Sequence, residues 1–212
     1  MSDRDALLKA MFPMVSADEA IDALVDAEAH RRGQPDRVSG AFHALALTQG
    51  MLLKEEYDLS THGHGAWVLG AVLADVRELT VINMHHGFPE GDRVLRATVE
   101  ALKSVAPGAK VVRTHADGFA ALLGPTAEQR IDEALGRRAK EALAKVTALG
   151  KPVAFTVGLL ELTVTQPSHP QVLSVLTWAE CERALAIARR EPFESVLRRH
   201  IALDGSVTLG PR

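Results

Sequence analysis

The stretch that decides the fold is LTVINMHHGFPEGDRVLRATVEALKSVAPGAKVVRTH, residues 79–115. It opens with LTVIN, a compact run rich in β-branched residues that is typical of a strand. The segment GDRVLRATVEALKSV then repeats its apolar residues at helical spacing, and AKVVRT is a second short run of strand type. Strand, helix and strand in this order predict a βαβ unit, in which the two strands are parallel and the crossover is right-handed.

The segment before this unit, AWVLGAVLADVREL at residues 66–79, is ambiguous. Periodicity alone cannot separate a continuous apolar run in a buried strand from one in a buried helix. Its length and its late charged residues, Asp75, Arg77 and Glu78, favour a helix. Upstream, SADE at residues 16–19 is a capping box, and the first sixty residues are predicted to form helices.

Several elements are expected downstream of the βαβ unit. A capping box at residues 126–129 opens a long helix that Gly150 and Pro152 end. PVAFTVGLLELTVT is a strong strand, and QVLSVL at residues 171–176 is interpreted as the antiparallel strand that returns from it. IALDGSVTL is expected to form a small hairpin with Asp204-Gly205 at the turn.

These elements predict an α/β fold, with a mixed sheet that has a parallel βαβ core and a C-terminal antiparallel pair, flanked by helices. Residues 1–212 are expected to form a single domain, on which the helical N-terminal segment, residues 1–60, is packed. The chain has 212 residues and is 47% hydrophobic, which is sufficient for a substantial core.

Composition argues against several classes of protein. The formal net charge is −3, no long basic run exists and aromatic residues are only 4%, all of which disfavour a nucleic-acid partner. The single cysteine, Cys181, provides no disulfide framework and falls in a helical pattern, where a small core residue is expected. No apolar stretch approaches the span of a bilayer, so no membrane partner is expected and a cytoplasmic location is predicted.

Several histidines and acidic residues indicate one candidate site for catalysis or ligand binding. In open α/β sheets, ligands bind beyond the carboxyl ends of the strands. The first predicted strand ends near His85 and His86, and the second ends at His115, followed by Asp117. These residues are expected to meet at one edge of the sheet. There His115, Asp117 and Glu90 would be the candidates for proton transfer.

A second histidine pair lies in STHGHGAW, residues 60–67. His62 and His64 are two residues apart, so in an extended segment both side chains point the same way and can bind one metal ion. With a third ligand from His85, His86 or His115, the set would suit a catalytic zinc that keeps one open position. A divalent metal, with zinc preferred, is therefore the expected cofactor.

Two other interpretations of the same residues stay open. Gly63 and Gly65 precede a potential helix start, where free backbone N–H groups would bind an anion. Alternatively, the histidines only form local hydrogen bonds. Asp117, in the sequence ADG, is also explained by turn formation, and Glu90 by the preference for acids at the start of a helix.

The leading hypothesis is a small cytosolic metal-dependent hydrolase or lyase that acts on a polar or anionic metabolite. Its histidine-lined cleft would lie near Asn83 and Thr114. The alternatives are a non-catalytic anion-binding, metabolite-binding or sensor domain, and a structural subunit of a complex. The alanine-rich helices would also suit contacts within a homo-oligomer.

Overall fold

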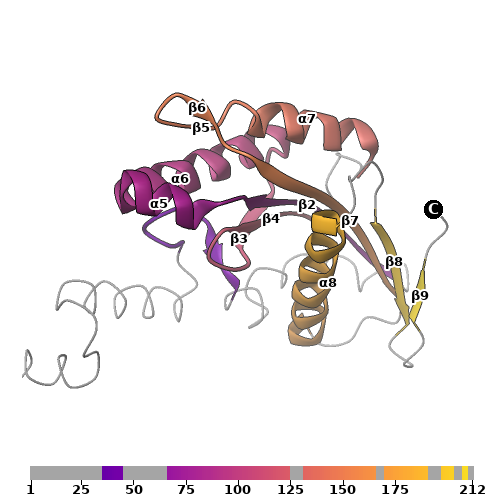
Figure 1. The fold of residues 1–212 in the computed structure, drawn as a ribbon. Coiled ribbons are helices and arrows are strands. Elements are labelled where there is room, and N and C mark those ends of the chain that lie inside the picture. The colour runs from indigo at the N-terminus through magenta and orange to yellow at the C-terminus, as the bar shows by residue number, and fades with distance from the viewer. Residues whose placement is uncertain are drawn as a thin grey trace, which may run out of the picture.

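Residues 35–44, 66–124, 131–165, 170–190, 197–202 and 207–209 are described by a computed structural model. Within these residues, seven strands form one mixed sheet in the order β1-β3-β4-β2-β7-β8-β9, and helices cover both of its faces (Figure 1). The predicted α/β class, with a mixed sheet flanked by helices, is confirmed.

The elements have the following bounds. The strands of the sheet are β1 Phe42–His43, β2 Ala66–Val76, β3 Lys110–Arg113, β4 Gly118–Leu123, β7 Phe155–Thr165, β8 Leu197–Ala202 and β9 Val207–Leu209. The short strands β5 Thr147–Ala148 and β6 Lys151–Pro152 pair only with each other. The helices are α5 Leu79–His86, α6 Phe88–Val105, α7 Glu133–Leu143 and α8 Pro170–Arg190.

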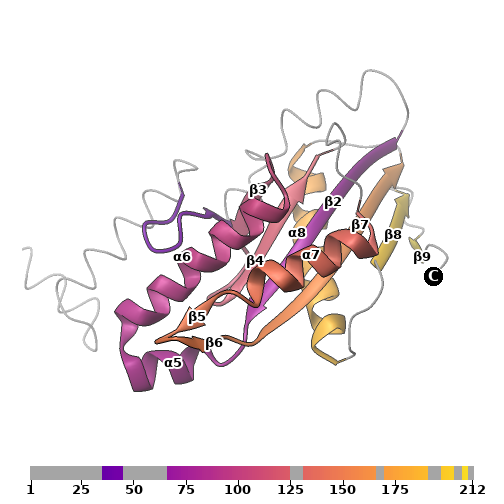
Figure 2. The same ribbon diagram turned by 90° about the horizontal axis from the view of Figure 1, so that it is seen from above.

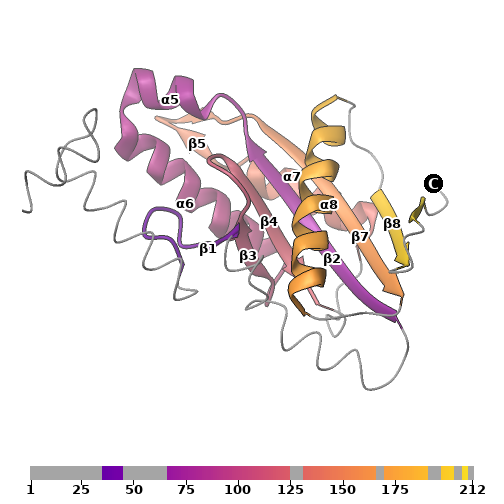
Figure 3. The same cartoon turned by 90° about the horizontal axis from the view of Figure 1, so that it is seen from below.

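The central strand is β2, so the predicted helix at residues 66–79 is wrong. β2 pairs in antiparallel fashion with β4 on one side and with β7 on the other. Its alternate residues belong to two cores: Leu69, Ala71 and Leu73 pack with α8, whereas Val72 and Ala74 pack with α6 and α7. Figure 2 shows α6 and α7 over one face of the sheet, and Figure 3 shows α8 across the other. A strand that is buried on both faces has no polar alternation, which explains the ambiguous apolar run.

The predicted strand LTVIN is also wrong, because these residues begin helix α5. β2 ends at Val76, and Glu78 turns the chain with a φ of 62° directly before the helix. Only Leu79 of α5 is buried, so the helix lies at the margin of the fold rather than in the sheet. Tertiary context has overridden the β preference of the branched residues here.

The βαβ connection exists, but its first strand is β2. Both β2 and β3 are antiparallel to β4, so they are parallel to each other with β4 between them. The predicted helix and second strand of the unit are confirmed as α6 and β3. A second unit, β7-α8-β8, joins two parallel strands that are direct neighbours.

The C-terminal part departs from the prediction in one helix. QVLSVL at residues 171–176 is the start of α8, not a returning strand, and Leu173 and Cys181 of this helix are buried against the sheet. Burial raises the pKa of the Cys181 thiol, as expected for an inert core residue. The predicted antiparallel hairpin is confirmed as β8-β9, and its turn residues 203–206 lie outside the described residues.

Helix α7 is shorter than expected. Asp132 caps it by accepting a hydrogen bond from the Leu135 amide at 2.8 Å, and the predicted capping box at residues 126–129 lies outside the described residues. The helix ends at Leu143 rather than near Gly150. Gly150, at φ 78°, instead forms the turn between β5 and β6.

Two broader expectations remain predictions. Residues 1–34 and 45–65, most of the proposed helical N-terminal segment, lie outside the described residues. The extent of the single domain is therefore untested as well. In the part of the chain that the structure describes, none of the helices has the length and apolar character needed to cross a membrane.

Candidate functional site

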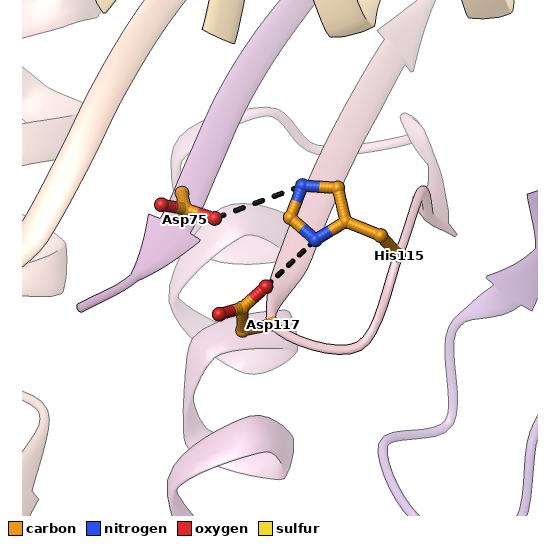
Figure 4. Close-up of side chains that lie close together, drawn as sticks. All are labelled: Asp75, His115 and Asp117. Carbon is orange, nitrogen blue, oxygen red and sulfur yellow. Dashed lines mark hydrogen bonds and ion pairs between the residues drawn. The ribbon is translucent and has the colours of Figure 1, made fainter. Parts of the chain in front are cut away.

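Three side chains meet where β2 ends beside the turn between β3 and β4. Asp75 is the penultimate residue of β2, and His115 and Asp117 lie in the turn. His115 Nδ1 is 2.7 Å from Asp117 Oδ1, and His115 Nε2 is 3.7 Å from Asp75 Oδ1 (Figure 4). One imidazole therefore lies between two carboxylates that are 42 positions apart in the sequence.

Backbone pairing brings these residues together. Asp75 is directly opposite Gly118 in the β2-β4 ladder. The Val76 amide donates to the Asp117 carbonyl at 2.9 Å, which holds the end of β2 against the turn. The Thr114 amide donates to the Gly118 carbonyl at 2.9 Å and closes the turn itself. Sheet geometry, rather than side-chain contact alone, thus determines the position of the cluster.

Helix α8 contributes a cation to this centre. Arg189 Nη2 donates to Asp75 Oδ1 at 2.7 Å, and Arg189 Nε donates to Asp75 Oδ2 at 3.1 Å. The same Nη2 lies 3.2 Å from His115 Nε2. The hydrogen bonds with Asp75 raise the pKa of Arg189 further, so the guanidinium stays charged. Glu182, also on α8, has Oε1 4.0 Å from His115 Nε2.

A pocket of about 360 Å³ opens at this centre. It is lined by Asp75, Val76, Arg77, Glu78, Asp117, Thr156 and Arg189. This volume falls within the range of small-molecule sites, which begins at roughly 300 Å³. Two arginines among the lining residues give the pocket groups that can bind phosphate or carboxylate.

Three residues of the cluster carry atoms of the kind that bind metal ions. Asp75, His115 and Asp117 each offer one ligand atom, and these atoms lie within 4.8 Å of one another. Carboxylate oxygen with imidazole nitrogen is a donor set that divalent metals accept. Both oxygens of Asp75 are already hydrogen-bonded to Arg189, however. A metal ion would fit this donor set only if the guanidinium moved away from Asp75.

The structure brings together two of the residues predicted from the sequence, His115 and Asp117. His85 and His86 lie exposed in the last turn of α5, with ring centroids 6.2 Å apart, and are not part of the cluster. His62, Gly63, His64 and Gly65 lie outside the described residues. The metal-binding and catalytic roles assigned to all these residues remain predictions.

Neither of the two residues predicted to mark the cleft lines the pocket. Thr114 adjoins the cluster, but Asn83 is a residue of α5, where its Oδ1 lies so close to Gly91 that a Cβ there would be 1.8 Å away. The error follows from the interpretation of LTVIN as a strand. That interpretation made Asn83 the end of a strand, whereas the strand ends at Val76.

Glu90, the third predicted catalytic residue, has structural partners. Its carboxylate accepts hydrogen bonds from Arg93 at 2.8 and 3.0 Å and from the Leu149 amide at 2.7 Å. Arg93 also donates to the Thr147 carbonyl. Glu90 therefore ties the first turn of α6 to the β5-β6 turn, where Leu149 has a φ of 46°.

The bond network of Glu90 predicts a pH-dependent contribution to stability. The Arg93 hydrogen bonds, followed by that of the Leu149 amide, lower the pKa of Glu90 from 4.5 to about 2. Because the folded pKa is depressed, the contribution is present above pH 4.5 and is lost as the pH falls towards 2. A Glu90→Gln variant should therefore unfold at lower urea concentration than wild type at pH 7, with a difference that shrinks below pH 4.5.

Glu100→Gln is the matched control, since Glu100 lies on the same helix and forms an exposed pair with Lys103. It should unfold at nearly the wild-type urea concentration at both pH values. A Glu90→Gln effect of the same size at pH 7 and at pH 3 would contradict the assignment.

Asp75 and Arg189 were not identified as site residues from the sequence. The available signal was one acid inside the apolar run of residues 66–76, which in a strand buried on both faces calls for a specific partner. The helix interpretation of that run concealed it. Arg189 has no local signal, since it lies 114 positions from its partner.

Comparison with known proteins gives one family. Residues 51–192 match the family described as diguanylate cyclase, GGDEF domain. No curated protein matches the sequence. Among solved structures, the diguanylate cyclase SiaD of Pseudomonas aeruginosa, in complex with its activator SiaC, is similar at a TM-score of 0.57 and 20% identity, over 88% of this chain and 68% of that one.

Two structures from Caulobacter crescentus are also similar. A sensory box/GGDEF family protein has a TM-score of 0.54 at 20% identity, over 74% of this chain and 98% of that one. The GGDEF domain of DgcB, in complex with c-di-GMP, has a TM-score of 0.51 at 16% identity, over 78% of this chain and 95% of that one. At these identities the structural likeness concerns the fold.

Proposed function

This chain belongs to the GGDEF family of diguanylate cyclases, and on that premise we propose that it binds a guanine nucleotide with the phosphates in the pocket beside Asp75. The observation that carries the proposal is the Arg189 guanidinium, held by Asp75 at the wall of that pocket. Arg77 lines the same pocket, so two cations are available to an anionic ligand.

The family corrects the function expected from the sequence. The hypothesis of a hydrolase or lyase that acts on a small metabolite is wrong, because the matching family consists of enzymes that join guanylate units into a ring. The anionic ligand expected from the sequence is now proposed to be a nucleotide. The expected divalent cation agrees with the family. Zinc has no support, and magnesium or manganese is the better candidate.

Phosphate recognition follows from the chemistry of the lining residues. The planar guanidinium matches two phosphate oxygens at once, so Arg189 could exchange its bonds to Asp75 for bonds to a nucleotide. Its side chain is 43% exposed, which leaves it accessible to a ligand. The carboxylates of Asp75 and Asp117 repel phosphate, so binding is expected to be stronger when a cation accompanies the nucleotide.

Joining two guanylates from GTP means that a hydroxyl oxygen of one nucleotide attacks the α-phosphorus of the other. The bond from that phosphorus to pyrophosphate breaks, pyrophosphate leaves, and the hydroxyl proton passes to water. In such phosphoryl transfers most of the catalysis comes from positioning and from neutralising negative charge. A divalent cation, when bound by Asp75, His115 and Asp117, would supply that neutralisation. Arg189 would orient the phosphates, and Asp117 would fix the ring of His115 through Nδ1. Two nucleotides must meet for this reaction, which is consistent with the predicted self-association of the chain.

Titration calorimetry of the purified chain with GTP tests the proposal. We expect GTP to bind with higher affinity than ATP, and an Arg189→Met variant to bind GTP at least about tenfold more weakly, as the loss of a charged hydrogen bond implies. Arg190→Met is the matched control, because Arg190 is the exposed neighbour on the same helix. Its GTP affinity should stay within about twofold of wild type. Failure of GTP to bind, or equal losses in the two variants, would refute the phosphate site.

A further inference from the structure

Residues 115–119, which comprise the turn before β4 and the first two residues of that strand, differ from the sequence that the family name spells. Written out, that name is Gly-Gly-Asp-Glu-Phe. Residues 115–119 of this chain read His-Ala-Asp-Gly-Phe. Asp117 and Phe119 keep the third and fifth letters, whereas His115 stands at a glycine position and Gly118 at the glutamate position. A large side chain therefore stands two residues before Asp117 and glycine stands directly after it, the reverse of the sizes in the family name.

Position 118 faces Asp75. The two residues are directly opposite in the antiparallel ladder, so a side chain at 118 would lie on the same face as Asp75, about 5 Å away between Cβ atoms. Ala120 and Leu122, further along β4, pack in the core beneath α8, which identifies this face. A glutamate at 118 would therefore place a second carboxylate beside Asp75.

In this chain His115 fills that space. A Cβ added to Gly118 would lie 2.3 Å from His115 Nε2, 2.4 Å from Cε1 and 2.8 Å from Cδ2. With the ring in this position, a side chain at 118 has no room, so the ring would have to move to admit one. The ring also presents Nε2 towards Asp75 at 3.7 Å, in the region that a carboxylate at 118 would approach.

We propose that His115 replaces the absent side chain of position 118, and that this paired exchange lowers the affinity of the centre for a hard divalent cation such as Mg²⁺. The proposal rests on the proposed function, whose chemistry needs such a cation. It identifies His115 and Gly118 as one specificity-determining pair that sets which cation the centre accepts.

The charges of the centre support the direction of the effect. Mg²⁺ prefers oxygen ligands, and two adjacent carboxylates attract it more strongly than one. Exchange of a carboxylate for an imidazole removes one negative charge beside Asp75 and offers nitrogen in its place. The remaining carboxylate of Asp75 is balanced by the guanidinium of Arg189 at 2.7 Å. Mg²⁺ must then compete with Arg189 for the same two oxygens.

The first experiment reverses the exchange in the full chain. Titration calorimetry with MgCl₂ compares wild type with the double variant His115→Gly/Gly118→Glu and with the single variant His115→Gly. We expect the double variant to bind Mg²⁺ at least about tenfold more tightly than the other two proteins, as an added carboxylate ligand implies. Equal Mg²⁺ affinity of wild type and the double variant would overturn the proposal.

The second experiment tests the exchange of space and needs no metal. Gly118→Ala is made in wild type and in His115→Gly, and thermal unfolding midpoints are measured. In wild type the added Cβ should displace the ring and lower the midpoint by at least about 3 °C. In the His115→Gly background the same change should leave the midpoint unchanged or raise it, since alanine suits a strand better than glycine. The same shift in both backgrounds would show that His115 does not occupy this space.

Neither readout uses a nucleotide, so the inference and the proposed function can fail separately. If GTP does not bind but the two Gly118→Ala shifts differ, the exchange is real and the nucleotide site is wrong. If GTP binds and the shifts agree, the nucleotide site stands and the exchange is wrong. The stability measurement also remains informative if the double variant does not fold.

Discussion

An Asp75→Asn variant is expected to form the cyclic dinucleotide at least about 100-fold more slowly than wild type in the presence of Mn²⁺, while it still binds GTP. Removal of the carboxylate takes away an oxygen that is proposed to bind the cation, and it removes the partner that holds Arg189. Loss of one preorganised electrostatic group costs about two to three orders of magnitude in rate. Nucleotide binding should persist, because the freed guanidinium and the missing negative charge both favour phosphate.

Chromatography of the reaction products, together with calorimetric titration of GTP, measures the two effects. Glu133→Gln is the control, since Glu133 is an exposed acid in the first turn of α7. Its rate and affinity should match those of wild type. A folded Asp75→Asn protein that produces cyclic dinucleotide at the wild-type rate would remove Asp75 from the reaction centre.

The second large effect concerns stability. Arg199→Met is expected to lower the free energy of unfolding by about 3 kcal/mol, because it leaves the buried Glu180 carboxylate with only the exposed Arg183, whose Nε is 3.5 Å from Oε1, as its charged partner. Arg199 on β8 donates from Nε to Glu180 on α8 at 2.8 Å, and the two residues are 6% and 5% exposed. The double variant Glu180→Leu/Arg199→Met should recover most of the loss, since it leaves no buried charge at this place and Arg183, which also loses Glu180, is exposed.

Urea denaturation measures these free energies, with Arg198→Met as the control. Arg198 is the sequence neighbour of Arg199, but its ion pair with Glu161 is 3.4 Å long and the arginine side chain is 40% exposed. Its loss should cost less than about 1 kcal/mol. If Arg198→Met and Arg199→Met destabilise the protein equally, burial of the second pair has no energetic importance.

Helices and strands whose sequence pattern depends on neighbouring residues could be predicted from the sequence. Helix α6 was predicted from its apolar stripe, strand β7 from its β-branched residues, and the β8-β9 hairpin from its Asp-Gly turn. Strand β2 could not be identified in this way, because its burial depends on helices that come later in the chain. The misplaced strand at residues 79–83 followed from that error, since a βαβ unit needs a first strand.

The same distinction applies to the residues of the candidate site, of which only those close together in the sequence could be predicted. His115 and Asp117 lie in one turn, so their proximity could be predicted from neighbouring residues. Asp75 and Arg189 come from different elements, and only the register of β2 against β4 and the packing of α8 bring them to that turn. Gly118 carries no signal by itself. The importance of Gly118 becomes clear only from the His115 ring, which fills the space of a side chain at 118, and from the residue that the family name gives at this position.

Helix α8 holds both ion pairs discussed above, and this arrangement has a mechanical consequence. Glu180 binds Arg199 of strand β8, and Arg189, nine residues further on, binds Asp75 of strand β2. Nine residues of helix span about 13 Å, and the segment between the two anchors is packed on the sheet through Cys181, Ala184 and Leu185. The position of strand β8 and the position of the Arg189 guanidinium are therefore linked through one packed segment of a single helix.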